Sequence, residues 1–318
     1  MKPHPVTRRL FIKESIKKTT ALAATASIGS LTRSVRGANS PSNYVVLGLV
    51  GAGGRGTSHA NGFSKLQGAE FKYICDVNDR QGVQMFRDLE KNQPHPLKRV
   101  TDMRRVFDDK EVDAVIVATP EHWHALATVW ACQAGKDVYV EKNPSLTIWE
   151  GRKMIEAARK YRRIVQVGFQ NRSAPYAVSA REYLRSGTLG KIVHVKVYNS
   201  ERIEIYGTKQ LMYLGRHGMG WQVMEVDGKV VAEEKGYHPD KWHQPNFLEC
   251  IRARNLPNSD IEQAHYSACL VHFGNVSYRV GQKQLYFDGQ TERFSNSEEA
   301  NRLLRPAYRK HYRIPDKV

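Results

Sequence analysis

A glycine-rich segment near the start of the chain has the spacing needed to bind a pyrophosphate. Gly51, Gly53 and Gly56 follow an apolar stretch that begins at Asn43, and they precede a segment compatible with a helix. In a strand–turn–helix unit the first glycine permits a tight turn, the second lets the backbone approach the phosphates, and the third lets the helix pack on the strand. The N–H groups at the start of the helix would bind the pyrophosphate. An ordinary glycine-rich loop can have the same spacing, so the neighbouring elements must show whether this segment is a phosphate-binding turn.

An acidic residue stands where a dinucleotide-binding unit needs one. Asp76 ends a second strand-like stretch, 70–76, twenty residues after Gly56. A carboxylate there accepts hydrogen bonds from the adenosine ribose hydroxyls and repels a 2′-phosphate. The predicted cofactor is therefore NAD rather than NADP. Gly54 and Arg55, inside the turn, are expected to contact it as well, and the cation of Arg55 partly offsets the repulsion.

Alternating strands and helices are expected to position these groups. Apolar strands at 112–120, 137–143 and 163–170 alternate with helical segments at 122–135 and 148–161. This alternation predicts an α/β fold with a doubly wound parallel sheet. Ligands of such sheets bind beyond the carboxyl ends of the strands. The polar residues at those ends, all candidate cofactor contacts, are Thr119, Pro120, Glu141, Lys142 and Gln170.

The charged pair Glu141-Lys142 closes the apolar strand "DVYV" and favours a role in the crevice. Thr119 could instead cap the following helix. That helix carries His122 and His124, but a third ligand at metal-binding spacing is missing, so no metal site is predicted.

These segments resemble the Gfo/Idh/MocA (glucose–fructose oxidoreductase/inositol dehydrogenase) family. The resemblance extends over most of the chain after residue 43. It rests on the glycine motif, "CDV" (75–77), "ATPEHWHA" (118–125), "GKDVYVEK" (135–142), "VGFQNRS" (167–173), "NFLECIRARNLPNSDIE" (246–262) and "EANRLLRPAYR" (299–309).

The resemblance implies an NAD-binding Rossmann domain, a second α/β domain with an open, mostly antiparallel sheet, and hydride transfer to or from a sugar or polyol. Lys142 matches the lysine of the family's Glu-Lys-Pro motif and is the catalytic candidate, while His124 joins the expected cofactor contacts. The motif's proline is replaced by Asn143, and Pro144 follows one position later.

The second domain is expected to be abbreviated. Two strand-like runs, 191–198 and 202–206, are separated only by residues 199–201, which predicts either a plain hairpin or the junction of a deletion. By comparison with exported members of the family, a region bearing an aspartate and a histidine that face the nicotinamide is missing. Segments 220–234 and 267–280 are the available cover for the exposed sheet.

Lys142 is then the sole acid–base candidate, because the remaining histidines are expected to be surface or packing residues. A glycosidase or lyase of the same family, or a catalytically impaired NAD-binding remnant, are the alternatives to an oxidoreductase. The histidines in question are His194, His217, His238, His243, His265 and His272.

Composition narrows the class of protein. The 318 residues are 41% apolar and 25% charged, which is typical of globular proteins, and no 18-residue apolar run predicts a membrane span. The formal net charge of +17 is scattered and accompanies no nucleic-acid-binding module, so no nucleic acid partner is predicted. The four separated cysteines indicate neither a disulfide framework nor a zinc site and are expected to be buried. The expected partner is a sugar-like small molecule, and a homo-oligomer stays open.

The predicted domains are a signal peptide at 1–38, a Rossmann domain at 43–165, a truncated substrate and oligomerisation domain at 166–290, and a tail at 291–318. The first forty residues resemble a twin-arginine signal. Arg8 and Arg9 precede Phe11 and Lys13, and a weakly apolar stretch follows at 19–31. The alternative is a basic amphipathic helix. The signal implies the twin-arginine export machinery as a partner and a periplasmic or other extracytoplasmic location, reached by a folded protein that already carries NAD.

We predict that changing Arg8 and Arg9 together to lysine retains the protein in the cytoplasm, because the export machinery requires the arginine pair. Cell fractionation followed by immunoblotting measures this. The matched control changes Arg33 and Arg36 to lysine and should export normally. Unaltered export of the Arg8/Arg9 variant would contradict the twin-arginine interpretation.

Overall fold

The computed structural model describes residues 44–93, 95–198, 202–215, 219–309 and 311–318. The predicted signal peptide and the junction at 199–201 lie outside the described residues. Among the described helices, none has the length and apolar character that a membrane crossing requires. The four cysteines are buried and unpaired with one another, as predicted.

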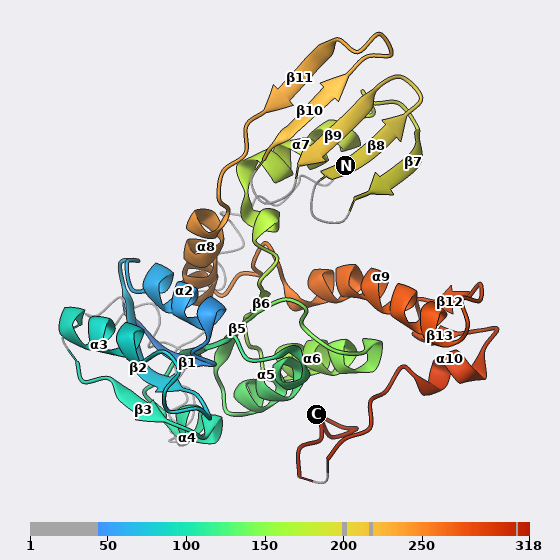
Figure 1. Ribbon diagram of the computed structural model, residues 1–318. Helices are drawn as coiled ribbons and strands as arrows, with labels where there is room; N and C mark the ends of the chain where they lie inside the picture. The colour runs from blue at the N-terminus through green and yellow to red at the C-terminus, as the bar shows by residue number, and fades with distance from the viewer. Residues whose placement is uncertain (1–43, 94, 199–201, 216–218, 310) are drawn as a thin grey trace, which may run out of the picture. The chain divides into compact units, whose positions relative to one another are not determined.

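A six-stranded parallel sheet forms the first half of the described chain (Figure 1). Its order is β3-β2-β1-β4-β5-β6, so the chain winds outward from β1, returns beside it at β4 and winds outward in the other direction. The carboxyl ends of β1 and β4 flank the point of reversal, where ligands of doubly wound sheets bind. The strands are β1 Val45–Val50, β2 Ala69–Cys75, β3 Lys98–Val100, β4 Ala114–Val117, β5 Asp137–Val140 and β6 Val165–Val167.

Both faces of this sheet are covered, as continuous apolar strands require. Alternate residues of the central strands enter two separate core clusters: Ile116 of β4 belongs to one, with α2, α3 and α8, and Val117 to the other, with α4, α5 and α6. The predicted doubly wound α/β fold is confirmed. The helices of this region are α2 Gly54–Phe63, α3 Val83–Asn92, α4 Met103–Asp108, the short η2 Glu121–Trp123, α5 His124–Gln133 and α6 Ile148–Lys160.

A second, antiparallel sheet follows η3 (Gln170–Ser173) and α7 (Pro175–Arg185), and its strand order is β11-β10-β9-β8-β7 (Figure 1). α7 packs on one face through a core that includes Tyr176 and Trp221. The mostly antiparallel second sheet is therefore confirmed. The expectation that 220–234 covers the sheet is wrong: alternating apolar residues make this segment the hairpin β10–β11. The strands are β7 Ile192–Val197, β8 Arg202–Gly207, β9 Leu211–Gly215, β10 Trp221–Met224 and β11 Val230–Glu234.

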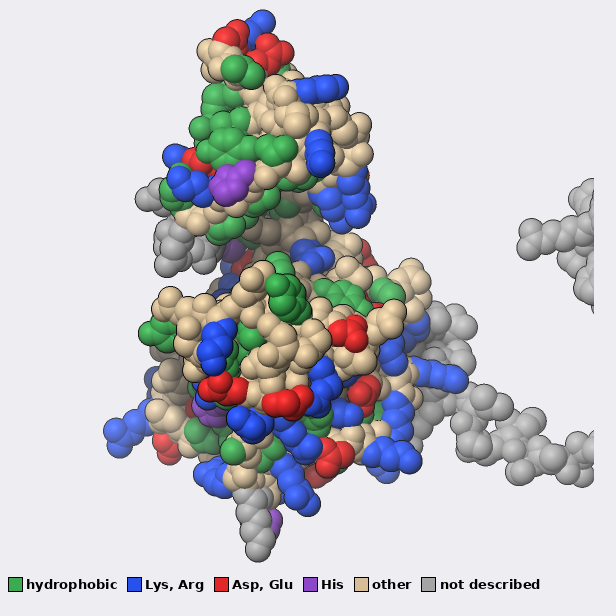
Figure 2. Space-filling view, turned by 90° about the vertical axis from the view of Figure 1, so that its right-hand side faces the viewer, with side chains coloured by type: hydrophobic (Ala, Val, Ile, Leu, Met, Phe, Trp, Pro, Cys, Tyr) green, Lys and Arg blue, Asp and Glu red, His purple; other side chains and the backbone are tan. Residues whose placement is uncertain are grey.

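Strand β7 is exposed along its whole length. It pairs with β8 in antiparallel register, and the N–H of Tyr198 donates to the carbonyl oxygen of Arg202 at 3.0 Å. The two strand-like runs therefore form an antiparallel pair. Apolar residues of β7 such as Val193 and Val197 face solvent, and Figure 2 shows hydrophobic side chains gathered on this part of the surface. Within the described residues, the outer strand of this sheet is uncovered.

The remaining elements return to the parallel sheet. α8 (Asp240–Ala253) contributes Phe247 and Leu248 to one core cluster, and α9 (Ile261–Arg279) contributes Ile261 to the other. The hairpin β12 Phe287–Asp288 and β13 Arg293–Phe294, the helix α10 Glu298–Arg302 and an extended tail complete the chain.

Candidate cofactor and active site

A cavity of about 880 Å³ lies at the carboxyl ends of the central strands of the parallel sheet. Its volume is in the range of small-molecule and cofactor sites. The loops after β1, β2, β3 and β4 converge on it. Five of the residues predicted from the sequence line it: Gly51, Gly53, Asp76, Thr119 and Pro120.

The glycine-rich turn has the shape that a bound pyrophosphate requires. Gly51 has φ +95°, and a Cβ on Gly56 would lie 1.9 Å from the carbonyl oxygen of Gly51. In contrast, a Cβ on Gly54 would meet nothing within 4 Å, so the backbone is open on that side. Gly53 precedes α2 without a side-chain cap, which leaves N–H groups at the helix start for an anion. The residues present therefore fit the phosphates of a dinucleotide.

Asp76 holds the turn in place from the end of β2. Its Oδ2 accepts a hydrogen bond from the N–H of Ala52 at 2.7 Å, and its Oδ1 accepts one from the N–H of Asn78 at 2.9 Å. Each carboxylate oxygen has a second lone pair. The same carboxylate can thus shape the turn and accept hydrogen bonds from ribose hydroxyls at the cavity wall.

His124 lies behind the cavity and is not among its lining residues. The buried ring places Nδ1 2.7 Å from the carbonyl oxygen of Asn143 and Nε2 2.8 Å from that of Thr119. The ring therefore joins the loops after β4 and β5 and positions them. Thr119 provides no side-chain cap to η2 or α5, and its buried Oγ1 has no hydrogen-bond partner among the described residues.

Three other predicted residues form a separate polar network. Oε1 of the buried Glu141 lies 3.0 Å from Arg55 Nε, 2.7 Å from His59 Nε2 and 3.0 Å from Gln170 Nε2. Arg55 also donates from both Nη atoms to the carboxylate of Asp240, at 3.0 Å each. The network joins α2, the end of β5, η3 and α8.

This network fixes Glu141 as an anion. Burial by itself would raise the pKa of Glu141, but the hydrogen bond and charge of His59 and the charge of Arg55 outweigh it and lower the pKa to about 2. A carboxylate with these partners is a poor proton acceptor for a substrate. Its Oε2 accepts a hydrogen bond from the N–H of Lys142 at 3.2 Å. Glu141 therefore positions the backbone of Lys142, whose side chain is exposed.

The described histidines of the second half pack or face solvent, as predicted. His243 is fully buried, with Nδ1 2.6 Å from Ser173 Oγ and Nε2 3.0 Å from the carbonyl oxygen of Val167. Burial lowers the pKa of His243 to about 4. His265 is equally buried, with Nε2 2.9 Å from Glu292 Oε1. The described residues contain no cluster of three metal-ligating side chains.

Several lining residues were not among the residues predicted for the site; Arg309 and Tyr312, for example, come from the C-terminal end of the chain. His59 and Asp240, which complete the Glu141 network, are likewise brought in by packing alone. The additional cavity residues include Gln81, Met103, Arg104, Trp123, Trp130, Arg309 and Tyr312.

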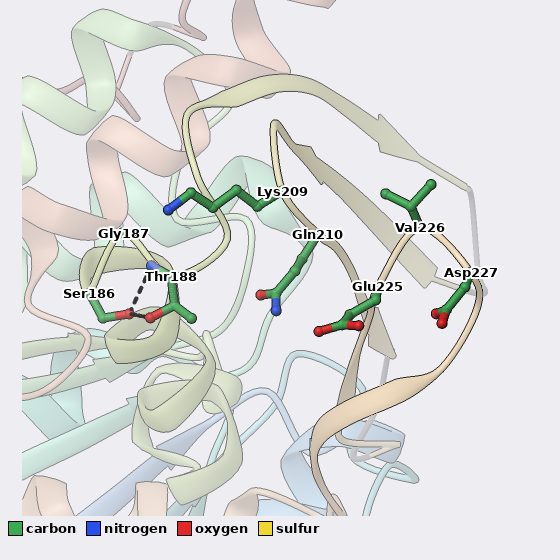
Figure 3. A pocket seen from close by; sticks show the side chains of 8 residues that line it. All are labelled: Ser186, Gly187, Thr188, Lys209, Gln210, Glu225, Val226 and Asp227. Carbon is green, nitrogen blue, oxygen red and sulfur yellow. Dashed lines mark hydrogen bonds between the residues drawn. The ribbon is translucent and has the colours of Figure 1, made fainter.

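A second hollow, of about 800 Å³, lies against the antiparallel sheet (Figure 3). It is formed by the loop after α7 and the turns β8–β9 and β10–β11. Ser186 and Thr188 bond to one another through their hydroxyls at 2.7 Å. The hollow contains none of the predicted site residues, so the cavity at the parallel sheet is the candidate site. The second hollow is also lined by Lys209, Gln210, Glu225, Val226 and Asp227.

Comparison with protein families gives two matches. A family model described as an oxidoreductase family with an NAD-binding Rossmann fold matches residues 45–169. A second model, described as the C-terminal α/β domain of the oxidoreductase family, matches residues 208–314.

A glycosyl hydrolase family 109 protein of Shewanella sp. (strain W3-18-1) is 26% identical over 252 residues, covering 74% of this chain and 51% of the relative. The chain thus spans about half the length of the curated relatives it matches.

Solved structures share the fold at low identity. Aldose-aldose oxidoreductase from Caulobacter crescentus, complexed with glycerol, superposes with a TM-score of 0.63 at 15% identity and covers 75% of this chain and 98% of its own. Levoglucosan dehydrogenase, in complex with NADH and levoglucosan, gives 0.57 at 15% identity, with 70% and 94% covered.

We predict that Asp76→Ala weakens NAD binding by about 1.5–3 kcal/mol, the scale of hydrogen bonds to a charged group. NADP should lose less affinity or gain some, because the repelling carboxylate is gone. Calorimetric titration of both cofactors tests this, with the exposed Asp79→Ala as the matched control. Equal losses for NAD and NADP would show that Asp76 acts only on the glycine-rich turn.

We predict a pH-dependent loss of stability in Glu141→Gln. The pKa of Glu141 is lowered from 4.5 to about 2 in the folded protein, so its stabilisation is present above pH 4.5 and is lost as the pH falls towards 2. Each unit corresponds to about 1.4 kcal/mol, so the loss at neutral pH is on the order of 3 kcal/mol. Urea denaturation at several pH values should show the wild type and variant converging in acid. The exposed Glu90→Gln is the control, and a pH-independent difference would be the contrary result.

Proposed function

Because the chain belongs to the Gfo/Idh/MocA oxidoreductase family, we propose that it transfers a hydride between NAD and a sugar or polyol. The observation that carries the proposal is the cavity at the point of strand reversal. It joins the open glycine-rich turn, Asp76 and the loop after β4, and β4 is paired with β5, the strand that Glu141 and Lys142 follow.

Different residues of the site have different roles in the proposed reaction. The glycine-rich turn binds the pyrophosphate, and Asp76 binds the adenosine ribose. When bound, the nicotinamide supplies the site that accepts or donates the hydride. Oxidation of a secondary alcohol also requires a group that takes the hydroxyl proton. Lys142 provides it, and Glu141 holds the backbone of Lys142 in place.

The proposed substrate class rests on the relatives. Two structural neighbours are named for aldose and levoglucosan chemistry, which supports a sugar-like substrate. The relatives named as glycosyl hydrolases favour a second candidate, glycoside cleavage by transient oxidation and re-reduction of the sugar. This second reaction leaves no net NADH.

We further propose that the second domain is abbreviated and that copies associate through it. The exposure of β7 on both faces supports this, because an uncovered apolar strand commonly marks an interface. An abbreviated second domain leaves the nicotinamide end of the site open to water. Water weakens the electrostatic stabilisation of the transition state for hydride transfer. Turnover is then slow. Export through the twin-arginine pathway with NAD bound belongs to the same proposal.

NAD titration paired with NADH production across a panel of sugars and polyols tests the function. We expect NAD binding with slow, sugar-dependent NADH formation. Lys142→Ala should reduce turnover about 10²- to 10⁴-fold, the usual contribution of general acid–base catalysis, without weakening NAD binding.

The exposed Lys65→Ala is the control and should retain full activity. Sugar release without net NADH would replace the first reaction by the second. NAD binding with neither product would contradict both and indicate a non-catalytic NAD-binding protein.

A further inference from the structure

The C-terminal strap, residues 305–309 and 311–318, reaches the cofactor cavity from the far end of the chain. Figure 1 shows it in red, between α10 and the chain end. Arg309 and Tyr312 are among the residues that line the cavity, together with Asp76 and the residues that follow β3. These last residues define the adenosine half of a dinucleotide site, because the first mononucleotide binds over the strands on the β2 side of the reversal point.

The two strap residues pack together with Trp123 at the cavity wall. The ring of Tyr312 contacts that of Trp123 edge-on, with centroids 5.3 Å apart and an interplanar angle of 87°. The guanidinium of Arg309 lies 4.5 Å from the centroid of the Tyr312 ring. The N–H of Tyr312 donates to the carbonyl oxygen of Arg309 at 2.9 Å, so a tight turn holds both side chains at the cavity. An aromatic wall of this kind suits the face of a purine.

Contacts on the N-terminal side of the turn hold the strap to the parallel-sheet domain. The hydroxyl of Tyr308 donates to Glu150 Oε1 at 2.7 Å, and Glu150 is itself buried in α6. Arg305 pairs with Asp316 at 2.6 Å across the turn, which ties the two arms of the strap together.

Contacts on the C-terminal side are partly apolar. Ile314 is 1% exposed and Val318 6% exposed, and both belong to the core cluster of the parallel sheet. Lys160 of α6 donates to the backbone carbonyl oxygen of Val318 at 2.5 Å, and Lys153 of α6 donates to the backbone carbonyl oxygen of Asp316 at 2.6 Å. Arg309 and Tyr312 therefore lie between two fixed points of the strap.

We propose that this strap is the outer wall of the adenosine site, with the Tyr312 ring packing on the adenosine and Arg309 bracing that ring. The inference rests on the NAD binding in the proposed function and adds two cofactor-binding residues to it. Base stacking on an aromatic side chain stabilises binding substantially, and burying the outer face of the adenosine slows its release. By linkage, the cofactor in turn stabilises the docked strap.

The test separates the two halves of the cofactor. NAD, AMP and nicotinamide mononucleotide are titrated into wild type, Tyr312→Ala and Arg309→Ala. We expect Tyr312→Ala to weaken NAD and AMP about tenfold and Arg309→Ala about two- to fivefold, with the affinity for nicotinamide mononucleotide unchanged. Tyr312→Phe keeps the ring and should bind all three as the wild type does.

Arg313→Ala is the matched control, since Arg313 is exposed on the same strap and does not line the cavity. Tyr312→Leu retains apolar packing on Trp123 without an aromatic face, and it serves as the second variant if Tyr312→Ala unfolds. Hydrogen exchange supplies an independent readout: AMP should protect the amides of residues 311–318, and nicotinamide mononucleotide should not.

Unchanged affinity of Tyr312→Ala and Tyr312→Leu for AMP, or equal losses for AMP and nicotinamide mononucleotide, would overturn the inference. Absence of sugar turnover with intact NAD binding would contradict the proposed reaction alone, because no arm of this test measures turnover.

Discussion

The buried carboxylate of Glu141 is the interaction on which the arrangement of the site depends. It stands at the end of β5, almost excluded from water, where an unpaired charge would be costly. Its partners come from two other elements: Arg55 and, one turn further on, His59 from α2, and Gln170 from η3. Satisfying one buried charge therefore fixes the helix that begins at the glycine-rich turn relative to β5, the strand that Glu141 and Lys142 follow.

Arg55 extends the same constraint to the second half of the chain. Its guanidinium is shared between Glu141 and Asp240. Burial lowers the pKa of Arg55, but the hydrogen bonds and charges of these two carboxylates outweigh burial and raise the pKa overall. Asp240 begins α8, a helix whose apolar residues pack on the parallel sheet. The sequence predicted that Arg55 contacts the cofactor. In the structure Arg55 instead links α8 to the parallel-sheet domain. Arg55 is not among the residues lining the cavity.

The two ends of the cofactor site differ in how they are walled. The adenosine half is bordered by aromatic rings from α5, η2 and the C-terminal strap, and the strap is anchored in the core of the sheet. In the proposed reaction the nicotinamide half lies towards Lys142, whose side chain is exposed, and the strand that opens the second sheet is uncovered. A site with a walled adenosine half and an open nicotinamide half is consistent with the NAD binding and slow turnover that we propose.

The sequence by itself determined the parallel sheet and the phosphate-binding turn, because both depend on local patterns. Buried parallel strands are continuous apolar runs, and the turn needs glycines at fixed spacing, as the positive φ of Gly51 and the close approach at Gly56 show. It also located the strand ends that carry Thr119, Glu141 and Lys142.

Only the tertiary structure decided what these residues do. His124 and Glu141 do not line the cavity and instead join loops and helices, since the partners of His124 are the carbonyl oxygens of two loops and those of Glu141 include Arg55 of α2. Segment 220–234 became strands of the second sheet because pairing with β9 satisfied its backbone. Tyr312 reaches the cavity from nearly two hundred residues beyond Trp123, and no local pattern records a contact of that span. Burial and long-range pairing, which periodicity and spacing do not encode, set these roles.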